Sequence, residues 1–125
     1  MEMHENTILE ALGFWRSVTL ETVRRDAPDL TSRQMALLLT VYLTDAPHTV
    51  RGLASQLNAS KPAITRALDT LGQMGFVKRK RDETDKRNVL VQRTVKGSVY
   101  LREFADIIQS GTETAQLGTA AATLQ

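Results

Sequence analysis

SKPAITRALDTLGQMGFVKRKRDETDKRNVLVQRTVKG, residues 60–97, joins a helical pattern to two strand-like segments, and this combination decides the fold. At 100° per residue, the helical part places apolar and polar side chains on opposite arcs. The apolar arc holds Ala63, Ile64, Ala67, Leu68, Leu71 and Met74, and the polar arc holds Lys61, Thr65, Arg66, Asp69, Thr70 and Gln73. Ser60 suits the N-cap, Pro62 suits the first turn, and Gly75 suits the C-cap. The pattern predicts an amphipathic helix.

The second half of the stretch has the pattern of a basic β-hairpin. FVKRK and VLVQRT are strand-like, and the charged segment KRKRDETDKRN, residues 78–88, contains the connection between them. A basic hairpin directly after a helix with a polar face is typical of a wing that lies beside DNA. The alternative is a solvated hairpin tip that touches nothing.

The segment before residue 60 predicts a short partner helix. RGLASQLN, residues 51–58, places Leu53, Ala54 and Leu57 on one face, and a tight turn follows at Asn58. Two short helices joined by a turn, the second with a donor-rich polar face, indicate a helix-turn-helix. An ordinary helical hairpin has the same periodicity, so the wing is needed to favour this interpretation.

The flanking segments predict further helices. One amphipathic helix runs from Glu5 to about Asp26. A second opens at Thr31, where Gln34 completes a capping box, and its apolar body MALLLTVYL is expected to form the centre of the domain. Residues 48–50 fit a very short extended segment. The last helix is expected to run from Val95 to about Ser110.

The basic charge is concentrated in the middle of the chain. The whole sequence has a formal charge of +2, but residues 51–96 hold eleven basic and four acidic residues, a net of +7. The remaining residues therefore carry a net of −5. Such a basic segment is the usual electrostatic footprint of nucleic-acid binding, whereas a chance distribution of surface charge is the alternative.

Composition excludes several other classes of function. The chain has no cysteine and only two histidines, His4 and His48, which are far apart, so we expect no disulfide, no metal site and no cofactor. No catalytic Ser-His-Asp pattern or phosphate loop is present, and we expect no enzyme activity. The longest apolar run, residues 35–43, is too short to span a bilayer. We therefore expect a soluble, cytoplasmic protein of one domain with no membrane contact.

The order of these features resembles the MarR family of winged helix-turn-helix transcription regulators. The resemblance rests on residues 60–97 as quoted and on TVRGLASQLNA, residues 49–59, and it extends from Glu5 to about Ile108. Its most specific part is the wing, where Asp85 precedes Arg87 by two positions and a strand then leads to Lys96 and Gly97.

The resemblance implies a mainly α fold with a small β-hairpin and a single winged-helix domain over residues 1–125. It assigns residues 5–26 and 95–110 to dimerisation helices and residues 31–94 to the DNA-binding lobe. The tail, residues 111–125, is expected to be a frayed helix or a disordered end. The expected partners are double-stranded DNA and a second copy of the chain.

The resemblance also implies which side chains meet DNA. Ser60, Lys61, Thr65 and Arg66 would meet base edges or flanking phosphates in the major groove, with Arg66 suited to guanine O6 and N7. Asp85 would brace Arg87 for insertion into the minor groove. The remaining expected DNA contacts, mainly to phosphates, are Arg51, Lys80, Arg81 and Lys86.

Two features depart from the family pattern or extend it. Arg93 occupies a position that is usually apolar, and Lys86 stands where a second arginine is common. Family members often bind small aromatic acids, and here Phe14, Trp15 and Tyr42 could line such an effector cleft. The alternative is that these three are simply core residues, so no effector is named.

Two functions from different classes follow. The first is a dimeric, sequence-specific transcription regulator, a repressor, that binds an inverted repeat with half-sites ~10 base pairs apart. The second is a winged-helix adaptor that binds another protein and has only nonspecific affinity for DNA.

Overall fold

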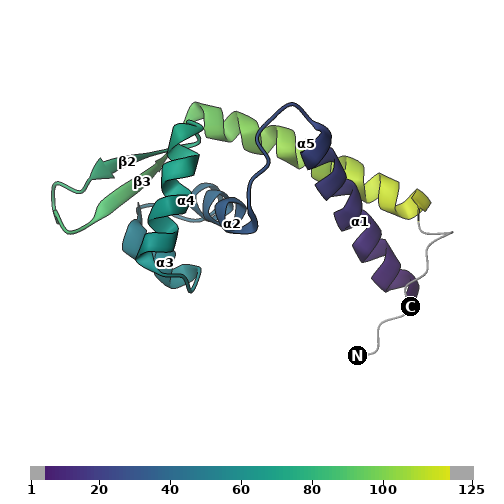
Figure 1. Cartoon of the computed structure of the whole chain (residues 1–125), viewed down its shortest axis with the longest axis horizontal. Coiled ribbons are helices and arrows are strands. Elements are labelled where there is room, and N and C mark those ends of the chain that lie inside the picture. The colour runs from purple at the N-terminus through teal and green to yellow at the C-terminus, as the bar shows by residue number, and fades with distance from the viewer. Residues whose placement is uncertain (1–4, 119–125) are drawn as a thin grey trace. The chain divides into compact units, whose positions relative to one another are not determined.

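The computed structural model describes residues 5–118, which form five helices and a three-stranded antiparallel sheet (Figure 1). The chain divides into two compact units, one of residues 30–101 and the other of residues up to 29 together with those from 102. The elements in chain order are α1 (Glu5–Arg24), α2 (Ser32–Leu43), β1 (His48–Thr49), α3 (Val50–Gln56), α4 (Lys61–Gln73), β2 (Val77–Arg81), β3 (Val89–Arg93) and α5 (Val95–Gly118). No helix within residues 5–118 is both long enough and apolar enough to cross a membrane.

Helix α2 contributes Leu37, Leu38 and Val41 to the core of the unit of residues 30–101, while its other side chains are partly or fully exposed. It begins with the expected capping box, in which Gln34 N donates to Thr31 Oγ1 at 3.2 Å and Thr31 N donates to Gln34 Oε1 at 2.9 Å. Its buried side chains meet those of α3, α4 and the sheet in one core. The fully buried members of that core are Leu37, Leu38, Val41, Leu53, Ile64, Leu68 and Leu71. Each contributes about 1.5–3 kcal/mol by leaving water.

The sheet has the strand order β1-β3-β2, with both pairs antiparallel. The hairpin predicted from the sequence is present, with Val77 opposite Arg93 and Arg81 opposite Val89. The short extended segment is also present, and it pairs with β3 through His48 opposite Val91. That segment ends at Thr49, because Thr49 Oγ1 accepts a hydrogen bond from Gly52 N at 2.9 Å and caps α3.

The start of α5 is fixed to this unit by a half-buried hydrogen-bond network around Tyr42. Tyr42 Oη donates to Phe76 O at 2.7 Å and accepts from Thr94 N at 2.9 Å. Thr94 Oγ1 donates to Gly75 O at 2.7 Å and accepts from Gly97 N at 3.0 Å. The network satisfies donors at the start of α5 that would otherwise lack a partner.

Arg93, the departure from the family pattern, has a structural role at the end of α2. Its Nε donates to Val41 O at 2.8 Å and its Nη2 donates to Thr44 O at 3.0 Å. Its guanidinium also lies 5.8 Å from the centroid of the Tyr42 ring. Because the last carbonyls of a helix have no partner within the helix and carry partial negative charge, an arginine here stabilises the end of α2.

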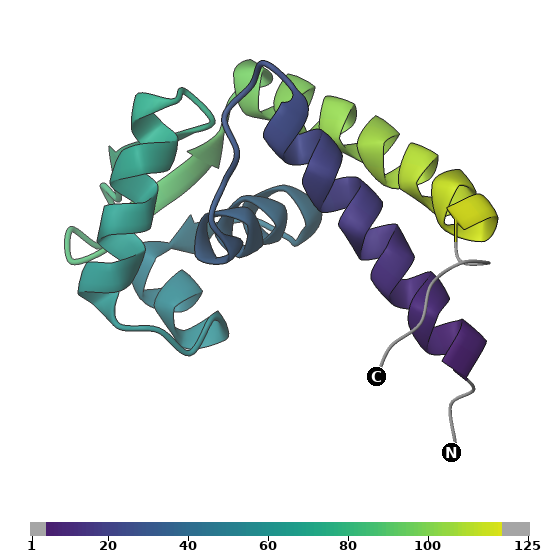
Figure 2. The same cartoon turned by 45° about the vertical axis from the view of Figure 1, so that its right-hand side comes forward.

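The other unit consists of α1 and the part of α5 from Arg102, which run side by side (Figure 2). Its buried residues include Leu9, Val18 and Phe104, and the Arg25 guanidinium lies 5.9 Å from the centroid of the Phe104 ring.

The two helix ends predicted for this unit need correction. Helix α1 ends at Arg24, before the expected Asp26. Helix α5 does not stop near Ser110 but continues to Gly118. Gly111 allows this continuation because α1 lies close to it, and a Cβ atom there would lie 3.0 Å from Val18 Cγ2. Packing thus outweighs the roughly 1 kcal/mol by which glycine disfavours a helix. Residues 119–125 of the predicted tail lie outside the described residues.

Candidate nucleic-acid interface

Helix α4 packs one face into the core and therefore exposes its opposite, polar face to solvent. The helix is capped by Ser60, whose Oγ accepts from Ala63 N at 3.2 Å, and Pro62 lies in its first turn. Its buried side chains are Ala63, Ile64, Ala67, Leu68 and Leu71, as the periodicity predicts. The side chains left on the exposed face are Lys61, Thr65, Arg66, Asp69 and Gln73. This face therefore offers hydrogen-bond donors and charge to a ligand that lies along the helix.

A tight turn connects α4 directly to the wing. Gly75 has φ +81° and follows the C-cap residue Met74. Gly75 N donates to Gly72 O at 3.0 Å and Phe76 N donates to Leu71 O at 2.9 Å, which is the Schellman arrangement. The left-handed conformation at Gly75 lets the chain reverse within two residues. Helix α4 and strand β2 are therefore held next to each other at this end.

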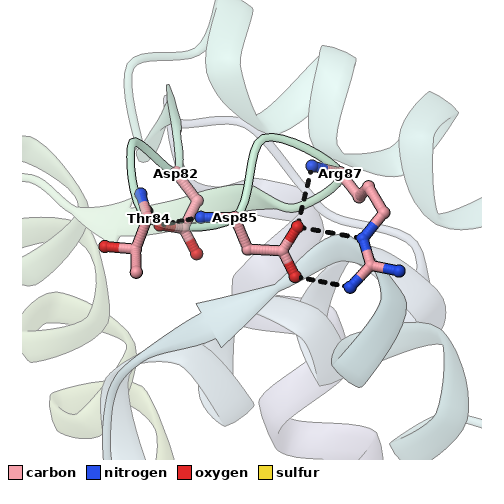
Figure 3. Close-up of polar contacts among 4 residues, drawn as sticks. All are labelled: Asp82, Thr84, Asp85 and Arg87. Carbon is pink, nitrogen blue, oxygen red and sulfur yellow. Dashed lines mark hydrogen bonds and ion pairs between the residues drawn. The ribbon is translucent and has the colours of Figure 1, made fainter.

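The wing loop, residues 82–88, is ordered by its own carboxylates. Asp82 Oδ1 accepts from Thr84 N at 3.0 Å and from Asp85 N at 3.3 Å, which closes a local turn (Figure 3). Asp82 N donates to Asn88 O at 3.2 Å and Asn88 N donates to Asp85 O at 2.9 Å. The acidic residues of this basic segment thus serve to shape the loop.

Asp85 and Arg87 form a two-pronged ion pair at the end of this loop (Figure 3). Arg87 Nε donates to Asp85 Oδ1 and Arg87 Nη2 donates to Asp85 Oδ2, both at 3.0 Å. The Arg87 side chain is nevertheless 77% exposed, so it stays available to a further partner. The pair that the family resemblance implied is present, and its action on DNA stays a prediction.

The charges around this pair stabilise both ionised forms. Hydrogen bonds from the Arg87 side chain and backbone lower the pKa of the Asp85 carboxyl below its ordinary value of 3.8, and the charge of Arg51 lowers it further. The same pair raises the pKa of Arg87. Asp85 is therefore ionised at neutral pH and holds Arg87 in one orientation.

The structure places all the residues predicted to meet DNA in the unit of residues 30–101. Arg51 is exposed on α3, and Lys80 and Arg81 are exposed on β2. Lys86 is exposed in the wing loop. Sequence reasoning missed one contact between α4 and β2. It is an ion pair of 2.6 Å between Asp69 Oδ1 on α4 and Arg79 Nη2 on β2. The exposed position of Asp69 on the predicted helix was the available signal.

The predicted effector residues are divided between the two units. Phe14 and Trp15 belong to α1, and Trp15 is 58% exposed. Tyr42 belongs to α2, and its hydroxyl is engaged by Phe76 and Thr94 as described above. The hydroxyl of Tyr42 thus has a structural role, and the effector cleft stays a prediction. Within residues 5–118, no group of three or more His, Asp or Glu side chains could hold a metal ion.

In the unit of residues 30–101, α3 and α4 form a helix-turn-helix, and β2 and β3 form the hairpin that follows it. This combination is the winged-helix fold, which is common in DNA-binding proteins. The profile described as MarR family matches residues 30–89, which span α2 through the start of β3. Residues 30–89, just under half of the chain, are therefore assigned to the MarR family. No curated protein sequence matches it significantly.

Solved structures agree with this assignment. The S. aureus MepR–DNA complex is similar with 20% identity and a TM-score of 0.66, over 86% of this chain and 83% of that one. Reduced AbfR bound to DNA, a protein of Staphylococcus epidermidis, is similar with 26% identity and a TM-score of 0.61, over 83% and 70%. The transcriptional regulator Tm0710 from Thermotoga maritima is similar with 26% identity and a TM-score of 0.68, over 89% and 78%.

Proposed function

We propose that this protein is a homodimeric, sequence-specific DNA-binding transcription regulator. The observation that carries the proposal is that one compact unit combines the exposed polar face of α4 with an ordered wing that holds Arg87 outward. The net charge of +7 over residues 51–96 suits a polyanion. The match of residues 30–89 to the MarR family supports the same function, as does similarity to MepR and AbfR, whose structures contain DNA.

In this proposal α4 enters the major groove. Arg66 is exposed on the same face as Lys61 and Thr65, and its planar guanidinium can donate to guanine O6 and N7 together. Lys61 lies in the first turn, where it can reach a phosphate or a base edge. Ser60 Oγ already accepts from Ala63 N, so its O–H group and one remaining lone pair can bond to DNA.

The wing follows the adjacent minor groove. Arg87 enters the groove, and the ion pair with Asp85 limits the rotamer entropy that its side chain loses on binding. A held arginine of this kind responds to the width of the groove more than to base identity. Arg51, Lys80, Arg81 and Lys86 contact phosphates and thereby set the position of the lobe.

An apolar stripe on α1 supports association of two copies. Leu12, Trp15 and Val23 are 50%, 58% and 70% exposed in the single chain. At 100° per residue these three side chains lie within an arc of about 80°. Covering such a stripe against a second copy removes large apolar side chains of both chains from water. A dimer with two-fold symmetry then presents two lobes to an inverted repeat.

We further propose that the dimer represses transcription. Half-sites one helical turn apart, ~10 base pairs, put both lobes on one side of the duplex. A dimer bound in this way within a promoter occupies DNA that the polymerase needs.

Selection of bound duplexes from a random pool, at near-physiological salt, tests the DNA-binding proposal. We expect enrichment of a two-fold symmetric motif. If all sequences are retained equally and only in a salt-sensitive way, sequence-specific regulation is refuted in favour of the adaptor function. Placing the enriched motif between promoter elements in a transcription assay then tests repression, and unchanged transcription would reject it.

A further inference from the structure

The ion pair between Asp69 and Arg79 joins two elements of the proposed DNA-binding surface. Asp69 Oδ1 on α4 lies 2.6 Å from Arg79 Nη2 on β2, with the two side chains 51% and 35% exposed. The ion pairs Arg24–Glu21 and Arg87–Asp85, in contrast, each lie within one segment of the chain. The Asp69–Arg79 pair therefore constrains how α4 and the wing are arranged, which a local pair cannot do.

Asp69 carries a negative charge on a surface that is proposed to bind the negatively charged DNA. It follows Lys61 and Thr65 at four-residue steps, so it belongs to the same exposed stripe of α4. An unpaired carboxylate there would be repelled by DNA. Arg79 neutralises this charge within the protein.

Arg79 is directed toward α4 by the strand register. Arg79 pairs with Val91 and shares a sheet face with Val77, because alternate residues of a strand point to the same side. Val77 and Val91 are buried, so this face is the inner one. Lys78 and Lys80 point to the opposite face. Arg79 is thus oriented differently from Lys78 and Lys80, its two immediate neighbours on β2.

The pair supplies a second attachment between the helix and the wing. The first is the turn at Gly75, where the two elements are continuous. Asp69 lies about 9 Å from that turn along the helix, and Arg79 lies about 7 Å beyond Val77 along the strand. After Val77 all residues of β2 are exposed, and the buried residue at the level of Arg79 is Val91 on the paired strand β3. The ion pair attaches β2 directly to α4 at this level, and it adds to the restraint that the turn and Val91 place on the angle between the two elements.

We propose that Asp69 and Arg79 are a positioning pair that fixes the angle between α4 and the wing, so that the two elements contact DNA in a single register. The inference rests on the proposed DNA-binding function and assigns the pair a role in sequence discrimination. With the angle fixed, a site whose major-groove and minor-groove features are correctly spaced is favoured. With the angle free, the wing adapts to more sequences, and discrimination falls.

Four variants of the full chain test the pair. Asp69→Asn and Arg79→Gln each break it, and the double reversal Asp69→Arg with Arg79→Asp restores a pair of opposite polarity. Lys78→Gln is the matched control, because it removes a neighbouring cation on the other sheet face. Fluorescence anisotropy gives the affinity for the selected duplex and for a scrambled duplex of equal length. The ratio of these two affinities is the readout.

We expect each single change to lower the ratio by roughly two- to fivefold per lobe, the range that surface ion pairs support. The double reversal returns the ratio to within about twofold of the starting protein. Lys78→Gln weakens binding to both duplexes by similar factors. The positioning role is overturned if Asp69→Asn strengthens binding to both duplexes equally, because Asp69 then acts only by repelling phosphates. It is also overturned if the double reversal, at unchanged thermal stability, fails to restore the ratio.

A measurement without DNA separates this inference from the proposed function. Spin labels at Gln73 on α4 and at Glu83 in the wing loop report the helix-to-wing distance by pulsed electron paramagnetic resonance. We expect a narrow distance distribution that broadens in Asp69→Asn and narrows again in the double reversal. An unchanged distribution would refute the positioning role even if the protein selects a DNA motif. Broadening without any motif selection would refute the proposed function and leave the pair's effect on geometry established.

Discussion

Gly97 and Gly72 provide a matched pair of substitutions whose effects on stability should have opposite signs. Both glycines lie within helices, so helix propensity alone predicts that alanine stabilises both positions by about 0.5–1 kcal/mol. A Cβ atom on Gly72 meets only Val77 O, at 4.0 Å, which is an ordinary contact. A Cβ atom on Gly97 would overlap Tyr42 Oη and Phe76 O and would lie 2.8 Å from Tyr42 Cζ.

The expected magnitude for Gly97→Ala follows from the groups that must move. Relieving the overlap costs about 1–3 kcal/mol in a packed environment. Displacing the Tyr42 hydroxyl also removes the acceptor of Thr94 N, and an unsatisfied donor costs about 1–3 kcal/mol. After the gain in helix propensity, we expect a net destabilisation of about 1–5 kcal/mol. Gly72→Ala is expected to stabilise by about 0.5–1 kcal/mol.

Urea-induced unfolding followed by circular dichroism measures both effects. Samples are compared at one protein concentration, because the stability of a dimer depends on concentration. Tyr42→Phe combined with Gly97→Ala should destabilise less than the sum of the single changes, since the first removes one atom with which the new Cβ collides. If Gly97→Ala is as stable as the starting protein, the described contact between α5, Tyr42 and Phe76 is wrong.

Three further predictions concern the candidate DNA interface. Arg66→Ala should lower affinity for the selected duplex by about 1–3 kcal/mol and affect a scrambled duplex less, as measured by anisotropy titration; equal losses on both would reject base readout by Arg66. Arg87→Ala should weaken binding to both duplexes and reduce the slope of log affinity against log salt by about one for each bound lobe, whereas an unchanged slope would place Arg87 away from DNA. Because the pKa of Asp85 is lowered, the Asp85–Arg87 ion pair should persist from neutral pH to below 3.8 and be lost as the pH falls through the folded-state pKa of Asp85. The nuclear magnetic resonance signal of Arg87 Nε–H reports the pair. A signal that already shifts between pH 7 and 5 would contradict this prediction.

The features that the sequence predicted well are those set by neighbouring residues. The Thr31–Gln34 capping box, the Ser60 cap and the turn at Gly75 each depend on groups within five positions of one another. The buried face of α4 follows from helical periodicity, which a single segment displays completely. Local geometry therefore sufficed to predict α4 and the hairpin that follows it.

The features that sequence reasoning missed depend on contacts between distant segments. Arg93 looked anomalous because its partners, Val41 O and Thr44 O, precede it by about fifty positions and are backbone atoms that no side-chain pattern reveals. The Asp69–Arg79 pair depends on the strand register, which the alternation of β2 alone does not specify. Helix α5 passes Gly111 because α1 packs there, which outweighs a local preference for a break.

Chemical footprinting with dimethyl sulfate on the selected duplex tests the central claim most directly, because the reagent methylates guanine N7 in the major groove and adenine N3 in the minor groove. We predict protection of guanine N7 in two half-sites ~10 base pairs apart and of adenine N3 beside them. Arg66→Ala should remove only the first protection, and Arg87→Ala only the second. Backbone protection from hydroxyl radicals without protection of either base atom would contradict the account, because the protein would then contact phosphates alone.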